Sequence, residues 1–108
     1  MDDIIEKADG LGQAIAQSPA YKALISQRKN IEDDQELQDR MQRLHTASEA
    51  IARKEQEGKP IEPEEKREVR DLQNGITQDP RMQQLARAEA DFAELMNKVN
   101  EAIRKRLG

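Results

Sequence analysis

The sequence predicts an all-α fold of four to five helices, forming a long helical hairpin or bundle with coiled-coil-like packing. Strand-favouring residues are scarce, with two Val and two Thr in 108 residues. Apolar side chains recur at spacings of three and four, the period of an amphipathic helix. Proline and capping residues divide this pattern into segments. We therefore expect one helical domain over residues 1–108, with helices at about 2–17, 19–32, 34–57, 63–78 and 80–107.

The first two predicted helices meet at Ser18 and Pro19. Ser is a preferred N-cap, and Pro suits the first helical position because the N–H that it lacks would have no partner there. Gly10 and Gly12 lie inside the first helix, where each costs about 1 kcal/mol relative to Ala; close packing on a neighbouring helix would explain them, and so would fraying. The apolar stripe of the first helix contains Ile4, Ala8, Leu11 and Ile15, and that of the second contains Tyr21, Leu24, Ile25 and Ile31.

A short loop joins the third and fourth predicted helices, which we expect to form a helical hairpin. Asp33 and Glu36 are spaced like a capping box at the start of the third helix. Gly58 suits the end of that helix, Pro60 does not continue it, and Pro63 suits the start of the next one. The third helix carries Leu37, Met41, Leu44, Ser48 and Ile51 at near-heptad spacing, and the fourth carries Val69, Leu72 and Ile76.

The last predicted helix carries the longest regular apolar stripe in the chain. Asp79 and Pro80 mark its start, as a cap followed by a first-turn proline. Its apolar positions follow a three-four rhythm through Met82, Leu85, Ala88, Phe92, Leu95, Val99, Ala102 or Ile103, and Leu107.

The composition predicts a thin hydrophobic core. Hydrophobic residues make up 35% of the chain, and Leu, Ile, Val and Phe together number 20 of 108. The 18 basic and 22 acidic residues nearly balance, so self-repulsion is weak and the helical period argues against disorder. Long helices with a thin core are easier to stabilise by pairing with another subunit. We therefore expect a homo-oligomer, a dimer or higher.

Several classes of protein are excluded or disfavoured by what the sequence lacks. The chain has no Cys, which excludes disulfides, thiolate zinc sites and cysteine-held iron–sulfur clusters. It has no apolar run of 18 residues and no signal-peptide pattern at its start, so we expect no membrane span and a cytoplasmic location. A pI near 5.1 disfavours non-specific binding to nucleic acid.

Catalytic chemistry is not indicated either. His45 is the single histidine, and only Glu49, one turn away, could share an ion with it. The Glu-x-x-His signature of di-iron bundles is missing, because Gln42 stands three residues before His45. No serine has a clear base and orienting partner, and no phosphate-binding glycine loop is present. We expect no enzyme activity, no cofactor, and no catalytic or metal-binding residue.

Most charges are expected to form a solvated surface. Six acid–base pairs stand at i, i+4 with the acid first, which is the favourable order. The basic run from Arg104 to Arg106 could contact nucleic acid, anchor a basic amphipathic helix, or offset the helix macrodipole. We favour the macrodipole, since three charges without aromatic neighbours are a weak nucleic-acid signal, and direct nucleic-acid binding is not expected. The six pairs are Glu36–Arg40, Asp39–Arg43, Glu49–Arg53, Glu62–Lys66, Glu94–Lys98 and Glu101–Lys105.

The order of these segments resembles the YlbF/YmcA family of small bacterial helical proteins, which includes the YheA branch. The resemblance covers almost the whole chain and depends on order and spacing, because the single motifs are helix caps and stripes. The segments that carry it are Leu11-Gly12-Gln13-Ala14-Ile15 followed by Ser18-Pro19-x-Tyr21-Lys22, the turn from Lys54 through Gly58-Lys59-Pro60 to Glu65, and the helix from Asp79-Pro80 through Phe92 to Ile103.

This resemblance implies an all-helical protein that associates with itself or with relatives and regulates without catalysis. Members of the family in some bacteria promote competence, sporulation and biofilm formation, through complexes that influence a phosphorelay and messenger-RNA maturation by ribonuclease Y. Some members carry cysteines linked to iron–sulfur clusters; this chain has no Cys, so that cofactor does not transfer. The family supplies no catalytic residues to carry over.

We therefore predict a regulatory adaptor that docks partner helices on an apolar helix face. Two alternatives stay open: an RNA-binding accessory factor that uses the basic run at residues 104–106, and a free-standing helical scaffold or chaperone-like protein. The residues expected to form the shared seam of the adaptor are Tyr21, Leu24, Leu85, Phe92, Leu95 and Val99.

Overall fold

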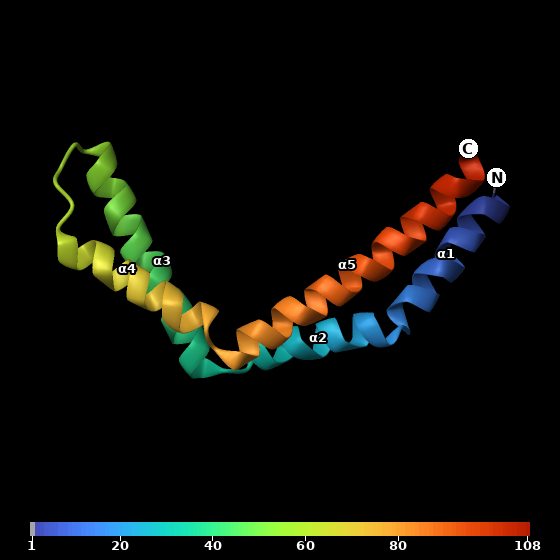
Figure 1. Cartoon of the computed structure of the whole chain (residues 1–108), viewed down its shortest axis with the longest axis horizontal. Helices are drawn as coiled ribbons and strands as arrows, with labels where there is room; N and C mark the ends of the chain where they lie inside the picture. The colour runs from blue at the N-terminus through green and yellow to red at the C-terminus, as the bar shows by residue number, and fades with distance from the viewer. Residues whose placement is uncertain (1) are drawn as a thin grey trace. The chain divides into compact units, whose positions relative to one another are not determined.

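Five α-helices occur in residues 2–108, and the predicted all-α class is confirmed. The computed structural model describes residues 2–108, and no strand occurs among them. Figure 1 shows the helices in chain order. They are α1 (Asp2–Ala16), α2 (Pro19–Glu32), α3 (Gln35–Gln56), α4 (Pro63–Thr77) and α5 (Pro80–Leu107).

The helices divide between two compact units. Unit 1 comprises residues 1–29 and 84–108, which are α1, most of α2 and most of α5. Unit 2 comprises residues 30–83, which contain the end of α2, the whole of α3 and α4, and the first residues of α5. The expectation of one domain stays a prediction.

Unit 2 is built on the predicted α3–α4 hairpin, in which the two helices pack side by side (Figure 1). Asp34 caps α3: its side chain accepts a hydrogen bond of 2.8 Å from the backbone N–H of Leu37. The sequence interpretation gave this role to Asp33, one residue too early. Asp34 is the residue with extended backbone angles (φ −90°, ψ 103°), which aim a cap side chain at the first turn.

Gly58 ends α3 as the sequence predicts. Its φ of 68° is the left-handed conformation that residues with a Cβ rarely adopt. Two hydrogen bonds close the turn around it: Gly58 N–H to the carbonyl of Glu55 at 3.2 Å and Lys59 N–H to the carbonyl of Lys54 at 2.9 Å. This pattern is a Schellman motif, which satisfies the last carbonyls of the helix before the chain turns toward α4.

Ion pairs and a small core hold unit 2 together. Lys54 pairs with Glu65, which joins the end of α3 to the start of α4. Arg81 pairs with Asp34 and, at 2.8 Å, with the buried carboxylate of Asp79, so it ties the α2–α3 connection to the α4–α5 connection. The buried apolar side chains of this unit are Ile31, Leu37 and Ile76, with Leu37 fully buried.

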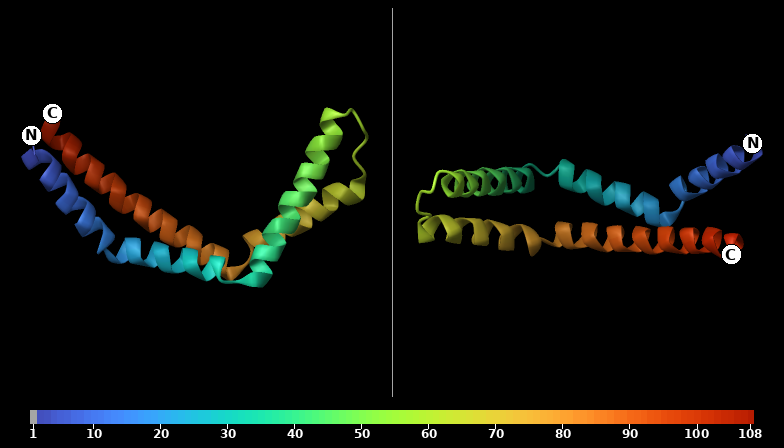
Figure 2. Two further views of the ribbon diagram at one scale, coloured as in Figure 1. Left: turned by 180° about the vertical axis from the view of Figure 1, so that it is seen from behind. Right: turned by 90° about the horizontal axis from the view of Figure 1, so that it is seen from above.

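In unit 1, α2 lies along α5 (Figure 2). Helix α1 precedes α2 in the chain, and a turn at residues 17–18 separates the two helices. The Ser18 hydroxyl donates to the carbonyl of Ile15 at 2.6 Å and accepts from the N–H of Tyr21 at 3.2 Å, which confirms Ser18 as the cap of α2. Leu24 and Ala88 are the buried apolar residues of this unit. The start of α1 and the end of α5 lie at the same end of the unit (Figures 1 and 2).

Candidate interaction surfaces

The first surface is the contact between α2 and α5 in unit 1. The rings of Tyr21 and Phe92, the only aromatic side chains of the chain, lie 5.5 Å apart between centroids and are tilted by 53°. This is a favourable aromatic geometry, which adds to the area that the two rings bury. Tyr21 and Phe92 are each half-buried, so part of both rings remains on the surface.

The six predicted seam residues all lie on these two helices of unit 1. Leu24 is 3% exposed and packs inside the chain. The other five are half-buried, so part of each side chain remains on the surface. Whether they meet another chain stays a prediction; the half-buried five are Tyr21, Leu85, Phe92, Leu95 and Val99.

Sequence reasoning did not include α1 among the interaction residues, and the structure shows it as the least covered helix. None of its residues is buried. Ile4 is 73% exposed, Ile5 65% and Leu11 39%. The stripe that predicted the helix was the available signal, because an apolar stripe with nothing to cover it marks a contact surface.

The far end of α5 is exposed in the same way. Ile103 is 49% exposed and Leu107 is 82% exposed. Large apolar side chains therefore remain uncovered on α1 and on the last turns of α5, which lie at the same end of unit 1.

These two segments carry opposite charge. Helix α1 contains four acidic residues (Asp2, Asp3, Glu6 and Asp9) and one basic residue (Lys7), so its net charge is −3. The last stretch of α5, residues 98–108, contains four basic residues and one acid, so its net charge is +3. Among residues 2–108 the ion pairs of α1 stay within the helix, as in Lys7–Asp3 at 3.4 Å, and none joins α1 to α5. The charged residues of the α5 stretch are Lys98, Glu101, Arg104, Lys105 and Arg106.

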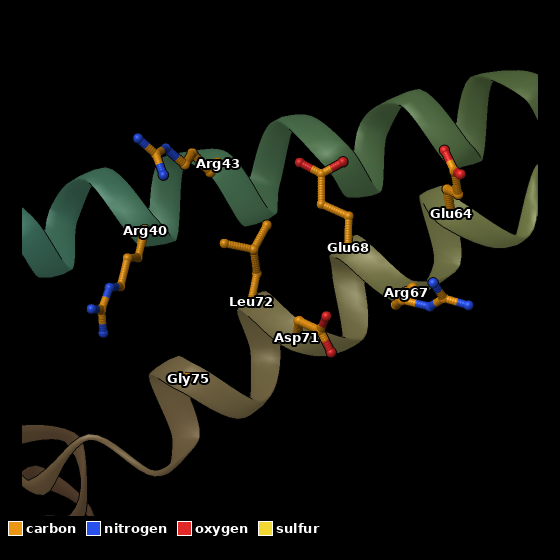
Figure 3. Close-up of a pocket in the computed structure, with 8 residues that line it drawn as sticks. All are labelled: Arg40, Arg43, Glu64, Arg67, Glu68, Asp71, Leu72 and Gly75. Atoms are coloured by element: carbon orange, nitrogen blue, oxygen red, sulfur yellow. The ribbon is translucent and has the colours of Figure 1, made fainter.

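The second surface is an open cleft of about 600 Å³ on the α3–α4 hairpin. In Figure 3, Leu72 and Glu68 point from α4 toward α3, while Arg40 and Arg43 project from α3. The three basic and three acidic side chains of the cleft sum to zero charge, so it has no bias toward a net anion or cation. Its lining residues are Arg40, Arg43, Glu64, Arg67, Glu68, Asp71, Leu72 and Gly75.

Glu65, next to the cleft residue Glu64 in the sequence, has an altered pKa. The hydrogen bond from the Lys54 ammonium lowers the pKa of Glu65 below its usual value, and the backbone N–H of Glu62, at 3.2 Å, adds to the effect. Both donors stabilise the ionised form. Because Lys54 belongs to α3, this ionised carboxylate joins the two helices of the hairpin.

Of the six expected i, i+4 ion pairs, two form in the structure. Glu36 pairs with Arg40 at 2.7 Å and Glu94 with Lys98 at 3.3 Å. Glu49 pairs instead with His45, at 2.9 Å, on an exposed part of α3. Exposed pairs of this kind contribute little to stability and mark a solvated face.

The sequence matches a known protein family over nearly its whole length. The profile of the family described as "Control of competence regulator ComK, YlbF/YmcA" matches residues 4–108. The chain belongs to the YlbF/YmcA family. The match contains all six seam residues and begins within α1, at Ile4.

Two curated relatives of this YlbF/YmcA-family protein span nearly its whole length. It is 24% identical over 105 residues to UPF0342 protein LBA1592 of Lactobacillus acidophilus, covering 97% of this chain and 90% of the relative. It is 23% identical over 105 residues to UPF0342 protein SSP0954 of Staphylococcus saprophyticus, covering 97% of this chain and 92% of the relative. No solved structure matches the chain.

Two further observations concern the chemistry open to this family member. Within residues 2–108, no group of three or more His, Asp or Glu side chains converges where a metal ion could bind. In that same part of the chain, no helix combines the length and apolar character needed to cross a bilayer.

Proposed function

We propose that this YlbF/YmcA-family protein is a non-catalytic regulatory adaptor that docks helices of partner proteins, including copies of itself, on its apolar helix faces. The observation that carries the proposal is the exposure of large apolar side chains in unit 1, such as Ile4, Ile5 and Leu107. Monomeric proteins rarely leave apolar side chains gathered in this way without a partner.

The family description supports the regulatory part of the proposal, since it names control of the competence regulator ComK. By resemblance, the partners belong to the complexes that act on competence, sporulation or biofilm formation and on ribonuclease Y-dependent messenger-RNA maturation. We also propose a cytoplasmic site of action, in line with the location expected from the sequence.

The seam proposed for partner docking is the half-buried part of the α2–α5 contact. Tyr21 and Phe92 lie at its centre and present aromatic area, which contributes strongly at interfaces. Leu24 would act from beneath, because it is buried and holds α2 against α5. Leu85, Leu95 and Val99 extend the same face along α5.

The test is complementation in a bacterium that carries this gene, with a ComK-dependent reporter as the readout. Deletion is expected to change reporter output, and wild-type protein to restore it. Phe92→Asp is expected not to restore it, because a charge on the seam is not accommodated in an apolar contact. The matched control is Ala93→Asp, the same charge on the exposed neighbouring position.

His45→Ala separates docking from catalysis, since His45 is the one histidine of the chain. It is expected to restore the reporter fully. Loss of restoration in His45→Ala, with Phe92→Asp active, would contradict a docking mechanism. Circular dichroism of the purified variants is the folding control, and each variant is expected to keep the helical signal of the wild type.

A further inference from the structure

We propose that α1 of one copy packs on the end of α5 of a second copy, and that the second copy returns the same contact. The two partners are the α1 face (Ile4, Ile5, Ala8, Leu11, Gly12 and Ile15) and the α5 tail (residues 98–108). This inference rests on the proposed function, because it names the surface through which the adaptor associates with itself.

The α1 face is a continuous apolar strip. Successive helical residues turn by about 100°, which places its members within one third of the helix circumference. Ile4 and Ile5 retain 73% and 65% of their exposure in the chain, and no residue of α1 is buried. The apolar side of the α5 tail, Ile103 and Leu107, is uncovered as well.

The net charges of α1 and of the α5 tail favour a contact between these two segments. Pairing α1 with the α5 tail of a second copy sets a net charge of −3 against one of +3, and twofold symmetry repeats the contact. Pairing α1 with α1 sets −3 against −3, and pairing tail with tail sets +3 against +3. Like charges across an interface are unfavourable, so the reciprocal α1–tail contact is favoured over both of these pairings.

Gly12 lies within the α1 face and adds no side chain to it. A Cβ added to Gly12 would meet no atom within 4 Å. In the proposed contact, the missing side chain of Gly12 would let the second copy approach the α1 backbone closely. Gly10 lies on the opposite side of α1 and offers a matched position outside the face.

Two charge-reversed proteins test the contact. The first, Glu6→Lys with Asp9→Lys, changes the net charge of α1 from −3 to +1; the second, Arg104→Glu with Arg106→Glu, changes that of the tail from +3 to −1. Each protein alone would place like charges together in both contacts. Mixed, they restore opposite charges in both, as +1 against −1 and −3 against +3.

Sedimentation at low ionic strength measures the outcome. Wild type is expected at twice the chain mass of 12.3 kDa, and each reversed protein at the mass of one chain, with a dissociation constant raised at least about tenfold. The equimolar mixture is expected to regain the dimer as a heterodimer. Added salt should weaken the wild-type dimer and should reduce the difference between the proteins.

Other occupants of these surfaces give different results. If α1 pairs with the tail of its own chain, mixing the reversed proteins will restore nothing; if the tail serves RNA or a membrane, wild type will sediment as a single chain. Either result overturns the inference. A wild-type dimer that survives both reversals also overturns it, and the proposed function then stands or falls on the Phe92→Asp reporter experiment alone.

Discussion

The α3–α4 hairpin and helix α1 differ in how far their apolar side chains are covered. All three helices are amphipathic and carry a modest apolar stripe. The hairpin covers its stripe within the chain, around the fully buried Leu37, and closes its ends with the Gly58 turn and the Lys54–Glu65 ion pair. Helix α1 buries none of its residues. The difference teaches that the same helical pattern can be covered within the chain, as in the hairpin, or left exposed, as in α1.

The largest expected effect is the difference in stability lost when a leucine is truncated in the hairpin and in α1. Leu37→Ala should lower the free energy of unfolding by about 2–5 kcal/mol, because a fully buried leucine is lost and a cavity remains. Leu11→Ala, at a position 39% exposed on α1, should change it by less than about 1 kcal/mol. Urea unfolding of both variants measures the difference. Equal losses would show that α1 is as well packed as the hairpin.

The next effect concerns Arg81, which holds the two connections of unit 2 together. Arg81→Met should cost about 1–3 kcal/mol, since the carboxylate of Asp79, 8% exposed, loses its charged donor. Arg70→Met is the control: its pair with Asp71, at 3.6 Å, is exposed, and its removal should change stability by less than about 0.5 kcal/mol. If both variants unfold at the same urea concentration, the Arg81 contacts contribute no more than a surface pair.

Two glycine substitutions should act with opposite sign. Gly58→Ala places a Cβ at a φ of 68° and should destabilise the hairpin by about 1–2 kcal/mol. Gly10→Ala, at an interior helix position where a Cβ meets nothing within 4 Å, should stabilise α1 by about 1 kcal/mol. Thermal unfolding followed by circular dichroism measures both. A stabilising Gly58→Ala would contradict the left-handed turn.

The smallest expected effect on stability appears only at acidic pH. Because Lys54 lowers the pKa of Glu65 in the folded protein, the ionised carboxylate stabilises the hairpin above the pKa of the unfolded chain. That contribution is lost as pH falls through the lowered folded pKa. Unfolding measured between about pH 6 and pH 2 should show this loss in wild type. Glu65→Gln and Lys54→Met should each lack it; an unchanged acid profile in either variant would rule out the pair as its source.

Much of the local structure could be predicted because it depends on neighbouring residues. Ser18 and Gly58 act as expected, since a cap and a left-handed turn involve only the adjacent helical turn. The cap of α3 was misplaced by one residue because Asp33 and Asp34 have the same side chain and differ only in backbone conformation.

Contacts between distant residues could not be predicted in the same way. Arg81 reaches Asp34 because two connections lie together in the folded unit, and no sequence spacing indicates this. Likewise, the apolar stripes predicted helices but not which stripe is covered. Leu24 and Ile4 occupy equivalent positions in that pattern, yet one is 3% exposed and the other 73%.

Hydrogen exchange of the α1 amides at different protein concentrations tests the central claim most directly. If α1 finds its partner in a second copy, its protection should rise with protein concentration, while that of the α3–α4 hairpin should stay constant. Protection of α1 that is the same at every concentration would contradict the account.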